Sequence, residues 1–555
     1  MTGFINENEN FADSTAKRAY HVIAKSSQFH DQIQNELIRD TSADDSVDSN
    51  VIPDRIVDIA KSKPSNPLVT MYYLTDDEVK KINQDERVQG IDLWSSAPDK
   101  MDAVQTGNWN KSPSSTGQYD NWGLLRHISA TNNFGTSTSI SGTYDYVLDG
   151  TGVDVVIQDS GIQADHPEWQ DANGVSRLKQ IDWETASGLT FGGSNMTGYN
   201  SSLQYTDTNG HGTHVAGTVA GKTFGWAKNA DIYSQKINLT GAGGITGGCM
   251  DISDVTGNGD TPFDVIRLWH NKKNNPSDPS YTGRPTVVQM SWGSGFSFST
   301  DANGSYFQAG GTNYYLSGIE YRGVRTNLTN HSSATAINLG MSPQGEFKFY
   351  NTSRIAEITN MINDGIIVSK SAGNGTCKHE ISTGPDWNNE LFVTVGFGGA
   401  EFGLWLHRTD FGPDELDGFT VGALDSTGAT SSADRKKGFS DAGPGVNIWS
   451  AGTNIISAMA STSGGNYYYN GSFRQAVYSG TSMAGPQVAG LCALVLQAHP
   501  DWTPKQIYNW VIDHATATIT GTGNSTSYGD DQSLLGAPNK VLWLPMNGDK
   551  TFNIG

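Results

Sequence analysis

Three short segments of this 555-residue chain each place a reactive side chain among small residues. They are VVIQDSG with Asp159, NGHGTH with His211, and SGTSMAGP with Ser482. A serine hydroxyl becomes a good nucleophile when a base takes its proton, and an imidazole suits that task near neutral pH. A carboxylate on the second ring nitrogen fixes the tautomer of the imidazole and stabilises its cation. The three residue types together predict nucleophilic catalysis.

The elements around these residues must bring them together, because they lie far apart along the chain. Asp159 ends the continuous apolar run GVDVVIQD (152–159), which is typical of a strand buried on both faces of a parallel sheet. Active sites of open α/β sheets form at the carboxyl ends of the strands, so Asp159 is well placed. Ser482 opens a predicted helix, whose first amides carry a partial positive charge.

Region 118–545 alternates between apolar runs typical of buried strands and segments with helical periodicity. The further predicted strands are 230–237, 285–291, 364–373 and 419–424, and the predicted helices are 214–220, 263–271, 354–361 and 483–499. The pattern predicts one α/β domain with a mostly parallel central sheet flanked by helices. Two stretches, near 296–350 and 380–417, are predicted to be surface insertions, and 546–555 is a C-terminal tail.

Residues 1–94 have a different pattern, which predicts a small separate α+β module after a loose start at 1–13. Strands are expected at 19–25, 55–60, 68–74 and 87–93, and helices at 27–40 and after the capping box that Thr75 and Glu78 form. The order β-α-β-β-α-β is that of ferredoxin-like modules. The polar, turn-rich residues 95–117 read as a linker.

The three motifs resemble the signatures of the subtilisin-like serine proteases and follow that family's order of Asp, His and Ser. The flanking segments NWGLLRHIS (121–129) and DSGIQADHPEW (159–169) are most similar to the proteinase K branch. The resemblance covers most of 118–545 apart from the insertions. It implies a subtilisin-like serine endopeptidase with Asp159, His211 and Ser482 as its catalytic triad.

Further site residues follow from the same resemblance. SKSAGNG (369–375) is similar to the family segment whose asparagine completes the oxyanion hole, which assigns that role to Asn374. QMSWG (289–293) is similar to the strand that pairs with extended substrate, which implies that Ser291, Trp292 and Gly293 contact the substrate. LTGAGGITG (239–247) corresponds more loosely to the opposite substrate-lining strand and suggests Gly243.

The N-terminal module resembles the inhibitor-type propeptide of the family. That likeness implies that residues 1–94 help the catalytic domain to fold and then act as its intramolecular inhibitor. A processing site is expected in the linker, between Trp94 and Gln118.

Composition limits the partners. The net charge of −21 argues against a general nucleic-acid binder, and no apolar run is long enough for a membrane span. The expected partners are protein or peptide substrates. The resemblance implies that no cofactor is required, and we assign no metal ligands. Many members of the family bind calcium, so a structural calcium ion stays an alternative. Residues 251–260 carry several oxygen donors but match no EF-hand pattern, which favours a surface loop. Three cysteines are too few for a disulfide framework.

Two questions stay open at this stage. The resemblance implies an extracellular protein, whereas the N-terminus shows no secretory signal, which leaves a cytoplasmic or particle-associated location open. The missing signal and the insertions also allow an alternative function. The chain would then be a structural or binding component, for example of a particle or virion surface, that keeps the fold with little or no proteolysis.

Overall fold

The computed structural model describes most of the chain in two compact units. The described residues are 17–39, 51–53, 55–62, 68–93, 105–107, 122–137, 140, 144–191, 199–238, 250–251, 261–293, 295–309, 311–332, 339, 341–343, 345–348, 350–409, 416–463, 467–468, 472–520 and 534–545. The first unit comprises Met1–Asp102 with Ile554–Gly555, and the second comprises Ala103–Asn553.

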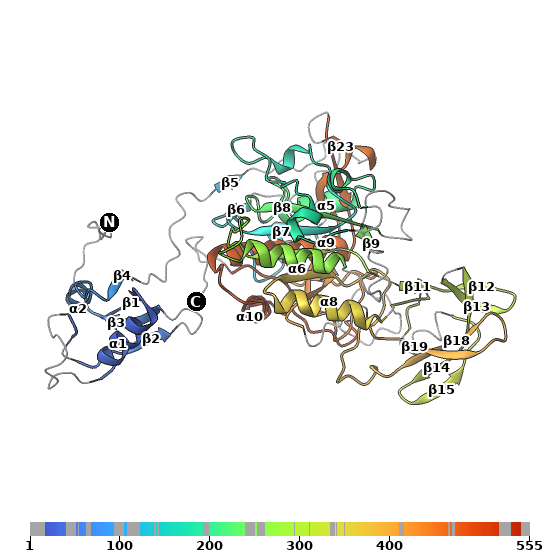
Figure 1. The fold of residues 1–555 in the computed structure, drawn as a ribbon. Helices are drawn as coiled ribbons and strands as arrows, with labels where there is room; N and C mark the ends of the chain where they lie inside the picture. The colour runs from blue at the N-terminus through green and yellow to red at the C-terminus, as the bar shows by residue number, and fades with distance from the viewer. Residues whose placement is uncertain are drawn as a thin grey trace. The chain divides into compact units, whose positions relative to one another are not determined.

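The first unit has the predicted element order β-α-β-β-α-β (Figure 1). Its elements are β1 (Arg18–Ala24), α1 (Ser27–Leu37), β2 (Ile59–Ser62), β3 (Val69–Leu74), α2 (Asp76–Ile82) and β4 (Val88–Leu93). The strands form an antiparallel sheet in the order β2-β3-β1-β4. The capping box of Thr75 and Glu78 is present at the start of α2. The second strand begins at Ile59 rather than at the predicted residue 55.

A seven-stranded sheet forms the centre of the second unit, and every neighbouring pair in it is parallel. In spatial order the strands are β21 (Ile448–Ala451), β20 (Phe419–Leu424), β17 (Ile367–Ser371), β10 (Thr286–Met290), β7 (Asp154–Asp159), β8 (Asp231–Asn238) and β9 (Met250–Asp251). The predicted parallel α/β sheet is therefore confirmed.

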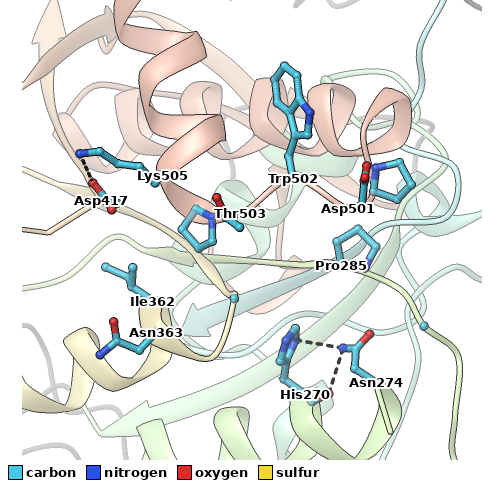
Figure 2. A pocket seen from close by; sticks show the side chains of 14 residues that line it. His270, Asn274, Pro285, Ile362, Asn363, Asp417, Asp501, Trp502, Thr503 and Lys505 are labelled. Atoms are coloured by element: carbon cyan, nitrogen blue, oxygen red, sulfur yellow. Dashed lines mark hydrogen bonds and ion pairs between the residues drawn. The ribbon is translucent and has the colours of Figure 1, made fainter. Parts of the chain in front are cut away.

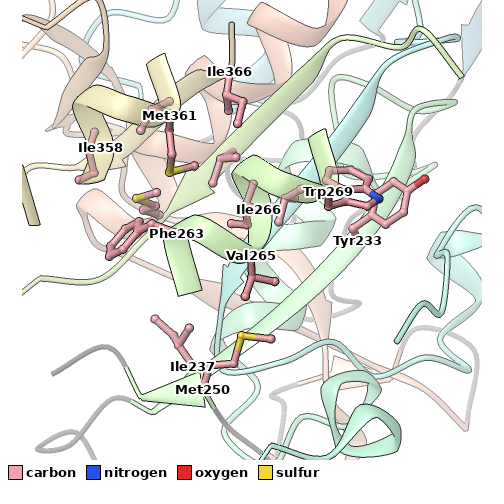
Figure 3. Packing of buried hydrophobic residues seen from close by; sticks show 14 of the residues in the cluster. Tyr233, Ile237, Met250, Phe263, Val265, Ile266, Trp269, Ile358, Met361 and Ile366 are labelled. Atoms are coloured by element: carbon pink, nitrogen blue, oxygen red, sulfur yellow. The ribbon is translucent and has the colours of Figure 1, made fainter. Parts of the chain in front are cut away.

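Helices cover both faces of this sheet. On one face, α6 (Pro262–Lys273) and α8 (Thr352–Asn363) pack on the strands through a shared apolar core that includes Phe263, Met361 and Val288 (Figure 3). On the other face, α5 (His211–Ala220) packs on α9 (Thr481–Ala498), and α9 lies along β10, β17 and β20. There the hydroxyl of Ser369 donates to the carbonyl oxygen of Gly485 at 3.0 Å.

Helices α5 and α9 begin earlier than predicted. The sequence predicts starts at residues 214 and 483, whereas the helices begin at His211 and Thr481. The glycines in front of these residues carry little helical propensity, which hid both starts from a periodicity argument. The consequence matters for function, because His211 is the first residue of its helix and Ser482 the second of its own.

The predicted insertions fold into a second β-structure with its own apolar core, which includes Phe307, Ile319, Phe347 and Leu391. Its strands are β12 (Ser299–Asp301), β13 (Gly304–Ala309), β14 (Thr312–Tyr321), β15 (Val324–Asn327), β18 (Glu390–Val395) and β19 (Glu401–Trp405). A short antiparallel ladder of β11 (Gly295–Ser297) with β16 (Glu346–Lys348) lies at its base, next to Gly293 in sequence. The sequence did not predict this second sheet.

Smaller elements complete the second unit. They are β5 (Gln105–Gly107), α3 (Trp122–His127), β6 (Tyr144–Tyr146), α4 (Trp183–Ser187), β22 (Ile455–Met459), β23 (Tyr467–Tyr468), β24 (Arg474–Tyr478), α10 (Pro504–His514) and the 3-10 helices Pro167–Trp169, Ser201–Tyr205 and Ser461–Ser463. Among the described helices, none is both long and apolar enough to cross a membrane.

The start of the second unit is fixed by buried polar contacts. Arg126 of α3 forms an ion pair with Asp434 at 2.5 Å, and both side chains are fully buried. His127 contacts the carbonyl oxygen of Leu542 through Nδ1 at 2.7 Å and accepts from the Ala451 amide through Nε2 at 2.9 Å. Two distant parts of the chain therefore meet at α3.

Candidate active site

Asp159 and His211 are in direct contact. Asp159 is the last residue of β7 and is fully buried, and His211 is the first residue of α5 with its side chain about one quarter exposed. The distance from His211 Nδ1 to Asp159 Oδ1 is 2.8 Å. Because a carboxylate only accepts, Nδ1 carries the proton and Nε2 keeps a lone pair. The imidazole is thereby prepared to act as a base through Nε2.

The loop before His211 is held by a second buried carboxylate, that of Asp207. Its oxygens accept from the Gly210 amide at 2.7 Å, from the Thr213 amide at 2.9 Å and from the Thr213 hydroxyl at 2.7 Å. The Ser160 hydroxyl, next to Asp159, also donates to Asp207 at 3.0 Å. Asp207 thus connects the end of β7 to the start of α5.

The two glycines of the NGHGTH motif allow β7 and α5 to approach closely at this point. Gly210 precedes the helix with φ +88°, a conformation that favours glycine. A Cβ atom on Gly212 would lie 2.3 Å from the carbonyl oxygen of Gly161, so a larger residue would force α5 away from β7. These glycines therefore set the distance between Asp159 and His211.

Electrostatics support the role of His211 as a base. Burial alone would lower the pKa of the imidazole, but the charge of Asp159, its hydrogen bond and the further charge of Asp207 raise the pKa above its usual value. The carboxylates thus stabilise the imidazolium that forms when the ring takes a proton.

Ser482 is the second residue of α9 and is partly exposed. Its hydroxyl donates to the carbonyl oxygen of Ser291 at 3.2 Å, and the Ser291 hydroxyl donates to the Ser482 carbonyl at 3.0 Å. Among the described residues, the Ser482 hydroxyl makes no hydrogen bond with His211. Asp159 and His211 are therefore hydrogen-bonded to each other, whereas Ser482 is hydrogen-bonded to Ser291, which directly follows β10, the strand beside β7.

Asn374 lies beside Ser482 in a fixed orientation. Its Oδ1 atom accepts from the backbone amide of Thr481 at 2.8 Å and from the Thr481 hydroxyl at 2.9 Å. The same hydroxyl accepts from the Gly373 amide at 3.0 Å. Because the oxygen is held by Thr481, the Nδ2 donor of Asn374 remains for another acceptor. Gly480 lies next to this amide, since a Cβ atom on it would be in van der Waals contact with Nδ2 at 3.4 Å.

A small cavity of about 190 Å³ adjoins both residues. Its wall includes Ser482, Asn374 and the predicted substrate contacts Ser291, Trp292 and Gly293. Lys348, Lys370 and His379 also line it, and the sequence analysis missed all three. Only Lys370 could have been found from sequence, because it lies in the segment SKSAGNG that identified Asn374. Gly243 and the segment 239–247 lie outside the described residues.

A larger cavity, of about 420 Å³, lies elsewhere (Figure 2). It is lined by the ends of α6 and α8, the start of β10 and the residues leading into α10, including His270, Pro285 and Trp502. Burial and the charge of Lys273 lower the pKa of His270 to about 4. None of the three candidate catalytic residues lines this cavity, so size does not identify the site here.

His214 and the two described cysteines, Cys377 and Cys492, are buried. The buried imidazole of His214 has Nε2 3.1 Å from the carbonyl oxygen of Ile455 and stacks on Tyr478. Cys492 is buried in α9, where burial raises the pKa of its thiol. Cys377 lies near Asn374, but burial also raises the pKa of its thiol well above the usual value. Neither thiol is activated.

No cluster of three or more potential metal ligands occurs within the described ranges. Most of the acidic segment 251–260 lies outside them. The prediction about calcium therefore remains a prediction.

The fold and the site define a parallel α/β protein in which an Asp–His contact lies at the carboxyl ends of the strands, together with a helix-borne serine. The family model of the subtilases, Peptidase S8, matches residues 150–530. This chain belongs to the subtilase family.

The similar curated proteins are distant relatives. An extracellular serine proteinase of Thermus sp. (strain Rt41A) is 25% identical over 85% of this chain and 74% of its own length. Alkaline serine exoprotease A of Vibrio alginolyticus is 24% identical over 70% of this chain and 47% of its own, and subtilisin E of Bacillus subtilis (strain 168) is 26% identical over 68% and 64%. The match spans less than two thirds of the latter two proteins. A solved cold-adapted subtilisin-like serine proteinase matches with 20% identity and a TM-score of 0.42, over 76% of this chain and 98% of that one.

Proposed function

We propose that this protein is a serine endopeptidase that cleaves peptide bonds through an acyl-enzyme intermediate. The observation that carries the proposal is the 2.8 Å contact of Asp159 with His211, on the same sheet edge as a helix-borne serine with an oriented asparagine beside it. Membership of the subtilase family supports the same chemistry.

In the proposed first step, the Ser482 hydroxyl turns from the Ser291 carbonyl towards His211. Nε2 of His211 takes its proton while Oγ attacks the peptide carbonyl carbon. Asp159 stabilises the imidazolium through Nδ1. The hydrogen bond between a nucleophile and its base is often long in a free enzyme and shortens when substrate binds. The present hydrogen bond from Ser482 to Ser291 is therefore compatible with this step.

The oxygen of the attacked carbonyl becomes negative. In the proposed mechanism, the Nδ2 group of Asn374 and the backbone amide of Ser482 donate to it. Ser482 lies in the first turn of α9, where backbone amides have no helical acceptor, and the helix dipole favours the negative charge.

The imidazolium then gives its proton to the leaving amine, and the peptide C–N bond breaks. Water then gives a proton to His211 and attacks the acyl carbon; the acyl–Oγ bond breaks, and His211 returns the proton to Ser482 Oγ as the carboxyl product leaves. Every step uses side chains of this chain, so we propose that catalysis requires no cofactor, with calcium at most a structural ion. The substrates are proteins or peptides, and Ser291, Trp292 and Gly293 are the proposed contacts.

We further propose that the first unit is a propeptide of the inhibitor type. Its support is the sheet order β2-β3-β1-β4 with two helices, which is the ferredoxin-like arrangement, and its separation as a compact unit before the catalytic unit. The proteinase K branch remains our proposed subgroup within the family.

Peptide hydrolysis by matched serine variants tests the proposal. Ser482→Ala should lose hydrolysis of a quenched fluorescent protein substrate, while Ser277→Ala, on an exposed loop, should retain it. The alternative function, a structural or binding component, predicts that the unaltered protein is inactive and that Ser482→Ala changes nothing.

A further inference from the structure

The cavity beside Ser482 has an unusual wall for a site that would accept a hydrophobic side chain. Two lysines and a histidine line it, namely Lys348, Lys370 and His379, together with the polar groups of Ser291 and Ser371. No carboxylate belongs to this lining among the described residues. A side chain that enters the cavity therefore meets a lining that contains Lys348, Lys370 and His379.

Lys348 reaches this wall from the inserted segment. It lies in β16, which pairs with β11 so that Lys348 stands opposite Gly295, two residues after Gly293. A Cβ atom on Gly373 would lie 2.6 Å from Nζ of Lys348, which places the ammonium group directly over the backbone next to Asn374. The insertion thus supplies a charge to the proposed catalytic centre.

Two carboxylates, those of Asp441 and Glu346, lie close to the residues that line the cavity. Asp441 is fully buried, with Oδ2 3.1 Å from Lys348 Nζ and 3.1 Å from His379 Nε2. Its Oδ1 accepts from the Gly375 amide at 2.9 Å and the Cys377 amide at 2.8 Å. Glu346 lies against Gly375. The ion pair with Asp441 holds Lys348 in place, and neither Asp441 nor Glu346 is among the residues that line the cavity.

His379 adds a polar group rather than a charge. Burial lowers the pKa of this imidazole, although its hydrogen bond to Asp441 opposes the change. The imidazole is thus held neutral near pH 7, so the positive charge of the lining comes from its lysines.

The cavity lies on the carbonyl side of the bond that would be cut. Ser482 and Asn374, which would hold the carbonyl carbon and its oxygen, both line it. His211, which must reach the leaving amine, is not part of its wall. The side chain attached next to the attacked carbonyl is therefore the one that enters.

We propose that this cavity selects an acidic side chain, aspartate or glutamate, immediately before the scissile bond, with Lys348 and Lys370 as its recognition residues. The inference rests on the proposed function. The cavity, of about 190 Å³, has room for the five heavy atoms of a glutamate side chain. A charge-assisted hydrogen bond is about twice as strong as a neutral one, so the preference over glutamine should be measurable.

The test uses quenched fluorescent peptides that differ only at this position, carrying glutamate, glutamine, leucine or lysine, with the cleaved bond identified by mass spectrometry. We expect kcat/KM to be at least about tenfold higher for glutamate than for glutamine. Raising the NaCl concentration should reduce that ratio, because salt screens partly exposed charges. Equal rates for glutamate and glutamine, or a preference for leucine, would overturn the inference while leaving the proposed function standing.

Substitutions of the two lysines test which of them provides the preference for glutamate over glutamine. Lys348→Gln should reduce the glutamate-to-glutamine ratio severalfold, Lys348→Arg should preserve most of it, and Lys505→Gln, on a remote surface pair, should leave it unchanged. Labelling by a fluorophosphonate reports whether each variant keeps a folded site. If Lys348→Gln does not fold, the ratio measured with Lys370→Gln decides. A failure of the unaltered protein to cleave any peptide or react with the probe would overturn the proposed function, and this inference with it.

Discussion

The side-chain oxygen of Asn374 accepts two hydrogen bonds from Thr481, one from its amide at 2.8 Å and one from its hydroxyl at 2.9 Å. Thr481 directly precedes Ser482, so the residue before the proposed nucleophile orients the proposed oxyanion donor. Thr481 therefore links the proposed oxyanion donor, Asn374, to the proposed nucleophile, Ser482. This relationship leads to the first two predictions.

Replacing Asn374 by alanine should lower kcat by about 10²–10³, with little change in KM, because the lost donor acts on charge that develops only in the transition state. Steady-state kinetics on one peptide measures both constants. Asn388→Ala, at an exposed position, is the matched control. A rise in KM alone would mean that Asn374 binds the ground state and would contradict this role.

Thr481→Val should lower kcat by a smaller factor, on the order of tenfold, since the amide of residue 481 still holds Asn374 while the hydroxyl does not. Thr481→Ser restores the hydroxyl and should recover most of the activity. In the Asn374→Ala background, Thr481→Val should have little additional effect. Full additivity of the two losses would show that Thr481 acts independently of Asn374.

The pH profile should report His211. Its raised pKa means that the imidazole stays protonated to a higher pH, and activity is lost as the pH falls through that pKa. Asp159→Asn removes the adjacent charge, so the acidic limb of kcat/KM should move to lower pH while the plateau falls by about 10⁴, the loss known for such a change in a serine protease. Asp278→Asn, at a partly exposed position outside the candidate site, should leave the profile intact. An acidic limb that does not move in Asp159→Asn would argue against the pairing.

The buried pair of Arg126 and Asp434 should matter for stability rather than chemistry. Arg126→Met leaves a buried carboxylate without its partner and should lower the free energy of unfolding by about 3–5 kcal/mol. Denaturant unfolding in the Ser482→Ala background avoids self-digestion. Lys505→Met, in an exposed pair with Asp417, should change stability little. Equal effects of the two substitutions would contradict the importance of burial.

Processing should depend on the protein's own activity. Intact-mass measurement of the purified protein should show a chain that begins within 95–117, together with a separate N-terminal fragment. Ser482→Ala should remain at full length, and a fragment of residues 1–94 added back should inhibit the processed enzyme. A full-length chain that is fully active would contradict the propeptide proposal.

The position of Asp159 could be predicted from sequence because it ends a clearly patterned strand, whereas the helices that carry His211 and Ser482 begin earlier than their periodicity indicated. The parallel sheet followed from apolar runs such as 152–159. The partner of the Ser482 hydroxyl could not be predicted, since the Ser291 carbonyl belongs to the backbone and has no sequence signal. Lys348 was equally hidden, because a ladder between β11 and β16 brings it to a site far from it in sequence.

The insertions show a different limit. Their composition predicted surface insertions, whereas the two stretches form one sheet in which Ile319 of the first pairs with Leu391 of the second. Pairing of β14 with β18 joins segments about 70 residues apart, which local patterns do not report.

Whether Ser482 is the nucleophile can be tested by treating the protein with a fluorophosphonate and locating the adduct by peptide mass spectrometry. We expect one adduct per chain, on Ser482, with labelling greatly slowed in His211→Ala and absent in Ser482→Ala. An adduct on another residue, or equal labelling of the Ser482→Ala variant, would contradict this assignment.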